Sequence, residues 1–138
     1  MSRLIIISNR LPFSIDRNNG HTIIRQSSGG LVSAIKSYFE RQQGHSLGYT
    51  QKIWVGSMDS SLEDWENVQK QGTVNEDFEI IPLFPPRECY HDFYNGFSNS
   101  TLWPLFHYFP SLVENKKEYF EAYRKINQLF ANKILDFV

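Results

Sequence analysis

Two short stretches of the sequence combine residue types that bind anions. "SNRLP" at residues 8–12 places Arg10 directly after an apolar run, and the planar guanidinium of arginine donates paired hydrogen bonds to phosphate oxygens. "SSGGL" at residues 27–31 places Gly29 and Gly30 before a helical pattern, where free backbone N–H groups and the helix dipole favour an anion. Both stretches also fit plainer roles, namely a surface arginine in a turn and a flexible linker with a helix N-cap. The glycine pair matches neither the G-x-G-x-x-G nor the P-loop pattern.

A third stretch, "DFYNGFSNSTLWPLFHY" at residues 92–108, mixes aromatic side chains with small amides and hydroxyls. Tyr94 and Trp103 are the candidate ligand contacts, because such rings suit sugar faces and a tyrosine hydroxyl can bond a phosphate or a sugar hydroxyl. An aromatic core helix capped by Asn and Ser is the alternative. If the stretch serves both roles, Phe97, Leu105 and Phe106 are predicted to lie in the core while Tyr94 and Trp103 face the ligand.

Three apolar segments predict the strands that position these residues. They are "RLIIIS" at 3–8, "KIWVG" at 52–56 and "FEIIPLF" at 78–84, and the lack of polar alternation in the first is typical of a strand buried on both faces of a parallel sheet. Ligands of such sheets bind at the carboxyl ends of the strands, which is where Arg10 lies. Residues 13–24 predict a hairpin, since Asn19-Gly20 is a strong tight-turn signal.

The segments between the strands predict helices. We expect helices over 31–44, over 61–72 with Ser60 or Ser61 as the N-cap and Gly72 at the end, and over 87–108 with a bend at Pro104. Residues 116–138 show the clearest apolar stripe, made by Tyr119, Tyr123, Ile126, Phe130 and Ile134. Alternating strands and helices predict an α/β fold, a Rossmann-like parallel sheet flanked by helices.

The composition is that of a soluble globular protein of one domain. The chain has 138 residues, 41% of them hydrophobic, and a formal net charge of −1, which argues against a nucleic-acid partner. Cys89 is the single cysteine, which fits a reducing compartment. The run "LIII" is shorter than a signal-peptide core of about 7–15 residues or a membrane span of about 20. We therefore expect a cytoplasmic protein with no membrane association. The histidines and Cys89 lack metal-ligand spacing, so no metal site is predicted.

Taken together and in order, "RLIIISNRLP", "SSGGLVSAI", "IWVG" and "YNGFSNSTLWPLFHY" resemble the start of the trehalose-6-phosphate synthase family, glycosyltransferase family 20. The resemblance runs over almost the whole chain, and "YRKINQLFANKI" is similar to the family's next helix. It implies an incomplete N-terminal, acceptor-side domain of a GT-B enzyme over residues 1–138, with the nucleotide-binding domain outside these residues. It also implies the transfer of glucose, with retention, from UDP-glucose to glucose 6-phosphate, without a metal or other cofactor.

The resemblance implies a role for each candidate residue. Arg10 and Tyr94 would hold the phosphate of glucose 6-phosphate, and Trp103 and Trp54 would line the acceptor pocket. Gly29 and Gly30 would let the backbone meet the diphosphate and glucose of UDP-glucose. No catalytic residue is expected within these residues, and a homo-oligomer is compatible with the family.

The chain departs from the family pattern at two places. Ser57 stands where the family often has a second tryptophan after Trp54. The later motifs, including an H-D-Y-H stretch and the Arg/Lys pair that steadies the departing diphosphate, are absent, so we expect the chain by itself to be inactive. The alternatives are a non-catalytic sugar-phosphate-binding subunit that pairs with a full-length synthase, and a GT-B transferase with another acceptor.

Overall fold

The computed structural model describes residues 2–18, 20–27, 29–41, 49–72, 74 and 78–138. The chain divides into two compact units, Met1–Phe84 and Pro85–Val138. Each unit is built around its own apolar cluster. Within the described ranges, no helix has both the length and the apolar character that crossing a bilayer requires.

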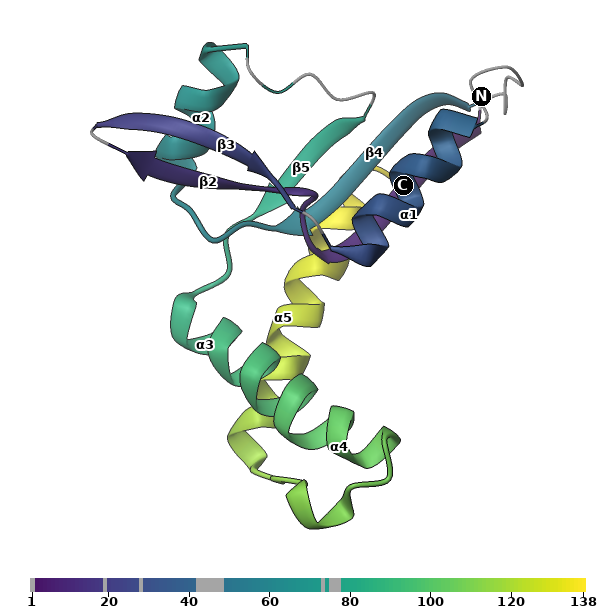
Figure 1. The fold of residues 1–138 in the computed structure, drawn as a ribbon, viewed down its shortest axis with the longest axis vertical. Coiled ribbons are helices and arrows are strands. Elements are labelled where there is room, and N and C mark those ends of the chain that lie inside the picture. The colour runs from purple at the N-terminus through teal and green to yellow at the C-terminus, as the bar shows by residue number, and fades with distance from the viewer. Residues whose placement is uncertain (1, 19, 28, 42–48, 73, 75–77) are drawn as a thin grey trace. The chain divides into compact units, whose positions relative to one another are not determined.

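The first unit is built on a three-stranded parallel sheet (Figure 1). Its strands are β1 (Ser2–Arg10), β4 (Tyr49–Ser57) and β5 (Glu79–Leu83), in the order β1-β4-β5. Helix α1 (Gly30–Arg41) lies between β3 and β4 along the chain, and α2 (Leu62–Lys70) connects β4 to β5. The predicted α/β fold with a parallel sheet and flanking helices is confirmed. The predicted helix stop at Gly44 lies outside the described residues.

The predicted hairpin is also confirmed. Strands β2 (Phe13–Asn18) and β3 (His21–Gln26) pair antiparallel, and the pair Asn18–His21 closes the turn. Gly20 has a φ of 78°, a left-handed conformation that glycine adopts without the steric cost of a side chain. Asn19, the other residue of the turn signal, lies outside the described residues.

The core of the first unit lies between the sheet, the hairpin and α2. Ile6, Trp54 and Ile80 are paired in register across β1, β4 and β5 and therefore share one face of the sheet. Phe13 of the hairpin stacks on Trp65 of α2 with ring centroids 5.9 Å apart. The hairpin is therefore part of the folded unit, because its apolar side chains belong to the same core as those of the sheet.

Helix α2 begins with a capping box, and this settles which serine caps it. The Ser61 hydroxyl accepts a hydrogen bond from the Asp64 backbone N–H at 3.1 Å, while the Asp64 carboxylate accepts one from the Ser61 N–H. Asp64 also accepts a hydrogen bond from Arg17 of β2 at 2.6 Å. The hydrogen bonds from Ser61 and then Arg17 lower the pKa of Asp64 below its usual value.

Replacing Ser61 by alanine is expected to destabilise the first unit by about 1 kcal/mol, the usual cost of losing a side-chain N-cap. Ser60→Ala is the matched control, because the buried Ser60 hydroxyl has no hydrogen-bond partner among the described residues. Urea unfolding of both variants, followed by far-UV circular dichroism, measures the difference. Equal losses for the two serines would contradict Ser61 as the cap.

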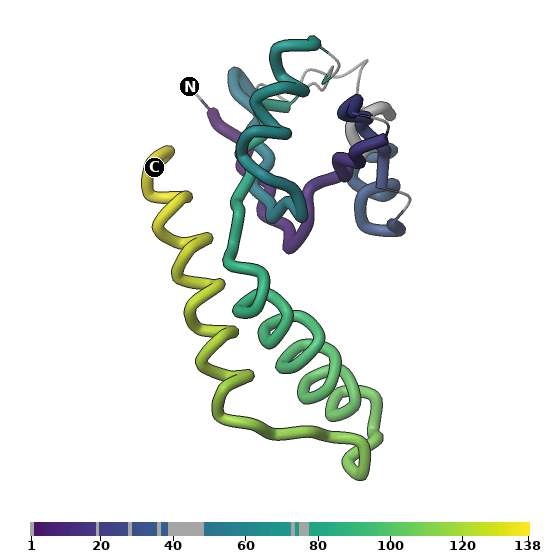
Figure 2. Tube along the Cα trace, turned by 90° about the vertical axis from the view of Figure 1, so that its left-hand side faces the viewer, coloured from purple at the N-terminus to yellow at the C-terminus, as the bar shows by residue number. Residues whose placement is uncertain are grey.

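The second unit is a pair of helical segments joined by a short turn (Figure 2). The first is one continuous helical run made of α3 (Arg87–His91), η1 (Asp92–Leu102) and α4 (Trp103–Phe106). A 3-10 turn, η2 (Pro110–Leu112), leads into α5 (Lys117–Leu135). The helices predicted over 87–108 and 116–138 are both present, but η1 is a π-helix rather than the expected α-helix.

Two small polar residues of the aromatic stretch donate hydrogen bonds to backbone carbonyls of this π-helix. The hydroxyl of Ser98 donates to the Phe93 carbonyl at 3.1 Å, and that of Ser100 donates to the Asn95 carbonyl at 2.8 Å, each across five residues. This spacing is that of the π-helical backbone bonds themselves. Pro104 has no N–H to continue the pattern, and the run returns to α-helix beside it.

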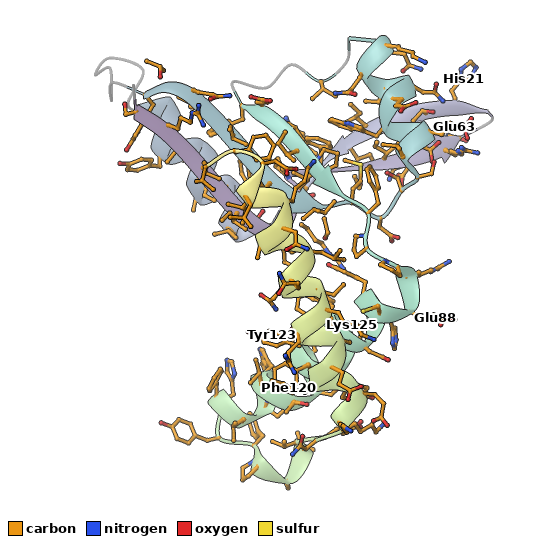
Figure 3. All side chains as sticks on the ribbon, turned by 180° about the vertical axis from the view of Figure 1, so that it is seen from behind. His21, Glu63, Glu88, Phe120, Tyr123 and Lys125 are labelled. Carbon is orange, nitrogen blue, oxygen red and sulfur yellow. The ribbon has the colours of Figure 1, made fainter. Side chains whose placement is uncertain are left out.

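Helix α5 packs its aromatic stripe against the π-helix. Phe97 lies with its ring centroid 5.5 Å from that of Phe120 and 4.7 Å from that of Tyr123, and Figure 3 labels these two residues of α5. Phe97 is therefore part of the packing, as predicted. Leu105 and Phe106 are 51% and 70% exposed, so their predicted place in the core is wrong. They follow the π-helix, which shifts every later side chain around the helix axis relative to an α-helical count.

Candidate functional site

Arg10 lies at an irregularity at the carboxyl end of β1. Ser8 pairs with Gly56, but the next partners are Arg10 and Ser57, so Asn9 is an extra residue and forms a bulge. An unbroken alternation would place Arg10 on the same face as Ser8 and Trp54, which is the core face. The bulge instead gives it the register of Ser57, and Arg10 is exposed.

Two serine hydroxyls hold the backbone of this bulge. Ser8 donates to the carbonyl of Arg10 at 2.6 Å, and Ser57 of the neighbouring strand donates to the carbonyl of Asn9. The Leu11 N–H is bonded to the Ser57 carbonyl at 3.1 Å. The main chain on both sides of the Arg10 Cα is therefore fixed by partners from β1 and β4.

Trp54 does not present its ring to a ligand, which corrects the prediction that it contacts the acceptor. Its side chain is 0% exposed and meets Phe78 edge-on with ring centroids 5.4 Å apart. Its indole N–H donates to the Ser8 hydroxyl at 2.8 Å. A tryptophan in the middle of a short apolar strand segment is compatible with either place. The period-2 pattern assigns Trp54 to the core face only once the register with Ile6 is known.

The start of α1 lies at the same edge of the sheet as Arg10. The Ser27 N–H donates to the Pro12 carbonyl at 2.8 Å, which ties the chain before α1 to the chain after β1. Gly29 accepts the first hydrogen bond of the helix, from Ser33 at 3.1 Å. A Cβ added at Gly29 or Gly30 would meet no atom within 4 Å. Both positions therefore have open space beside the backbone, and their contact with a donor stays a prediction.

Tyr94 and Trp103 belong to the second unit, and the structure gives them separate surroundings. Tyr94 is half-buried and stacks on Tyr90 with ring centroids 5.9 Å apart. Trp103 is 51% exposed and stacks on His107 at 4.0 Å and on Phe109 at 6.4 Å. Trp103 thus forms the middle of a three-ring stack at the end of the helical run.

Sequence reasoning missed the residues that shape the Arg10 turn, namely Ser8, Gly56 and Ser57. Gly56 is the one that left a signal, because a glycine inside a strand often marks a close approach of another backbone. A Cβ at Gly56 would lie 2.8 Å from the Leu11 nitrogen and 3.0 Å from the Arg10 carbonyl carbon. Among the residues described, no group of three His, Cys, Asp or Glu side chains is arranged to hold a metal ion.

Comparison with known proteins identifies the family to which these features belong. The family model of glycosyltransferase family 20 matches residues 2–138. The chain belongs to glycosyltransferase family 20. Two relatives in this family are UDP-forming α,α-trehalose-phosphate synthases. The enzyme of Schizosaccharomyces pombe is 40% identical over 134 residues, and enzyme A of Dictyostelium discoideum is 35% identical over 138 residues.

The family 20 fold is also found in solved structures. The UDP-forming α,α-trehalose-phosphate synthase of Burkholderia xenovorans, in complex with glucose 6-phosphate, superposes with a TM-score of 0.60 at 26% identity, covering 99% of this chain and 26% of that one. The alignments with the two relatives cover 96% and 97% of this chain but 25% and 17% of theirs. The chain therefore spans a quarter or less of the length of these two relatives.

Proposed function

We propose that these residues form the acceptor-side part of a UDP-forming trehalose-phosphate synthase. The reaction is the transfer of glucose from UDP-glucose to glucose 6-phosphate, with retention at the anomeric carbon, to give trehalose 6-phosphate and UDP. The observation that carries the proposal is the exposed Arg10 at a fixed bulge on the carboxyl edge of the sheet, where ligands of open α/β sheets bind. Complete transfer is proposed to require the remaining length of a synthase.

Arg10 is proposed to bind the phosphate of glucose 6-phosphate. Its guanidinium provides a fork of donors that matches phosphate oxygens, and its main chain is held on both sides. The Burkholderia xenovorans enzyme, whose structure holds glucose 6-phosphate, supports this class of acceptor. In the second unit, Tyr94 and Trp103 are proposed as further acceptor contacts, the first through its hydroxyl and the second through its half-exposed ring.

Gly29 and Gly30 are proposed to face the donor. Open space around both positions lets the diphosphate and glucose of UDP-glucose reach the backbone, and the positive end of α1 favours the diphosphate charge. A solved E. coli structure bound with UDP-2-fluoro glucose shares the fold, with a TM-score of 0.58 at 23% identity. The single cysteine supports a reducing compartment, and we propose that the reaction takes place in the cytoplasm.

The role of Arg10 is tested by calorimetric titration of the chain with glucose 6-phosphate and with glucose. Arg10→Ala is expected to weaken binding of the phosphate ester roughly 10- to 100-fold, since a hydrogen bond to a charged group contributes about 1.5–3 kcal/mol. Binding of glucose itself should change little. Arg3→Ala is the matched control, because Arg3 lies on the same strand towards its opposite end. Unchanged affinity in Arg10→Ala would refute the phosphate role.

A further inference from the structure

We propose that Ser8, Ser57, Gly56 and Trp54 are positioning residues, which hold the Arg10 peptide in the conformation that binds a phosphate ester. The proposal rests on the proposed function of Arg10 as the phosphate ligand. On this proposal, the residues around the bulge contribute to the affinity for a phosphate ester as well as to the packing of the fold. None of the four needs to touch the ligand, because Ser8, Ser57 and Gly56 contact the main chain of residues 9–11 and Trp54 bonds to Ser8.

The bulge explains why side chains are needed at this place. An extra residue interrupts the ladder between β1 and β4 at Asn9, and serine hydroxyls bond the carbonyls of both Asn9 and Arg10 there. The Ser57 hydroxyl of β4 donates to the Asn9 carbonyl, and the Ser8 hydroxyl of β1 donates to the Arg10 carbonyl. Polar backbone groups left without partners away from water are costly, so the two hydroxyls select the conformation that satisfies both carbonyls.

Trp54 sets the direction in which the Ser8 hydroxyl donates. A hydroxyl has one proton and two lone pairs. The indole N–H of Trp54 occupies a lone pair at 2.8 Å, and the proton is donated to the Arg10 carbonyl at 2.6 Å. Consecutive hydrogen bonds of this kind strengthen one another. A fully buried ring thereby acts on Arg10 through a single hydroxyl.

Gly56 allows β4 to lie directly against the peptide that follows Arg10. A Cβ there would meet two main-chain atoms, the Leu11 nitrogen at 2.8 Å and the Arg10 carbonyl carbon at 3.0 Å. Backbone atoms cannot rotate away as the end of a flexible side chain can. Any larger residue at this position must therefore displace the Arg10 turn itself.

Fixing the main chain raises affinity because less freedom is lost when the ligand binds. Arginine has a long side chain whose ordering costs free energy. When the Arg10 main chain is fixed, only the side-chain torsions remain to be ordered on binding. The guanidinium then starts from a single backbone position. The same logic requires binding groups to be supported by residues that do not themselves touch the ligand.

The test compares serine variants at the bulge with a matched variant at the other end of the same strand pair. Ser8→Ala and Ser57→Ala are each expected to weaken glucose 6-phosphate binding about fivefold, the factor that corresponds to one hydrogen bond. Thr50→Val is the control. The Thr50 hydroxyl also joins β4 to a β1 carbonyl, that of Ser2 at 3.3 Å, but at the opposite end of the strands. Its affinity should equal that of the unmodified chain.

Coupling to Arg10 separates positioning from a general loss of structure. In an Arg10→Ala background, Ser8→Ala should have no further effect on affinity, because the group that it positions is gone. Ser8→Thr keeps the hydroxyl and should restore binding, and Trp54→Phe keeps the ring without its N–H and should weaken binding as Ser8→Ala does. Serine variants that bind as tightly as the unmodified chain, while Arg10→Ala does not, would overturn the proposal.

Amide hydrogen exchange of the ligand-free chain tests, without any ligand, whether the serine hydroxyls hold the main chain at Arg10. Ser8→Ala and Ser57→Ala should speed exchange of the Leu11 N–H, which Thr50→Val should leave unchanged. A chain that binds no glucose 6-phosphate in any form refutes the proposed function and the affinity role together. If exchange of Leu11 is the same in all variants, the positioning role is refuted even if Arg10 binds phosphate.

Discussion

Trp54→Ala is expected to lower the free energy of unfolding of the first unit by about 3–5 kcal/mol, the range for removing a buried large aromatic side chain. Trp54 is 0% exposed, and its face of the sheet meets the hairpin and α2 through a shared core. Native domains are stable by only about 5–15 kcal/mol. The variant should therefore unfold at a much lower urea concentration, as measured by far-UV circular dichroism.

Trp54→Phe is the companion variant, because it retains a buried ring while removing the indole N–H. We expect it to lose clearly less stability than Trp54→Ala. The difference between the two variants isolates the packing contribution from that of the hydrogen bond to Ser8. A loss of less than about 1 kcal/mol in Trp54→Ala would contradict its place at the centre of this core.

Gly96→Ala is expected to destabilise the second unit by about 1–3 kcal/mol, the typical cost of overpacking. A Cβ at Gly96 would lie 2.5 Å from one carbon of the Tyr119 ring and 2.7 Å from another. In an ordinary helix the same change would stabilise, since alanine is favoured over glycine by roughly 0.5–1 kcal/mol. The contact with α5 reverses the sign. Thermal unfolding followed by the helical circular dichroism signal measures it.

Two further variants make the Gly96 prediction decisive. Gly30→Ala is the matched control, because a Cβ there meets nothing within 4 Å, and it should be neutral or slightly stabilising. Tyr119→Leu should relieve the contact, so that Gly96→Ala costs less in its presence than alone. Equal costs in both backgrounds would show that Tyr119 is not the neighbour that limits residue 96.

The regular elements could be predicted from the sequence because their signals are local. The apolar runs of β1, β4 and β5, the turn at Gly20 and the Ser61 cap depend on short-range chemistry that each segment carries with it. The place of Arg10 at the carboxyl edge of the sheet was predicted for the same reason. Its exposure depends on the bulge at Asn9, which is a property of two paired strands and has no signature in one of them.

The sequence pattern could not predict the π-helix, and the reason is physical. An aromatic stretch with several small polar residues predicts a helix, but the choice between four- and five-residue spacing depends on how the hydroxyls of Ser98 and Ser100 bond to the backbone and on contact with α5. Leu105 and Phe106 were assigned to the core, but they follow the π-helix, which changes the faces of later side chains, and both are exposed. Trp54 was misplaced because the family resemblance assigned its ring to the acceptor pocket, whereas the pairing of β4 with β1 places it on the core face.

The distribution of tryptophans gives the molecule two optical labels. Trp54 and Trp65 are 0% and 5% exposed and lie in the first unit, whereas Trp103 is 51% exposed and lies in the second. Emission that a neutral aqueous quencher such as acrylamide suppresses therefore arises mainly from Trp103, and the protected emission arises from the other two. The unfolding of each unit can be followed in a single cuvette without attaching a dye.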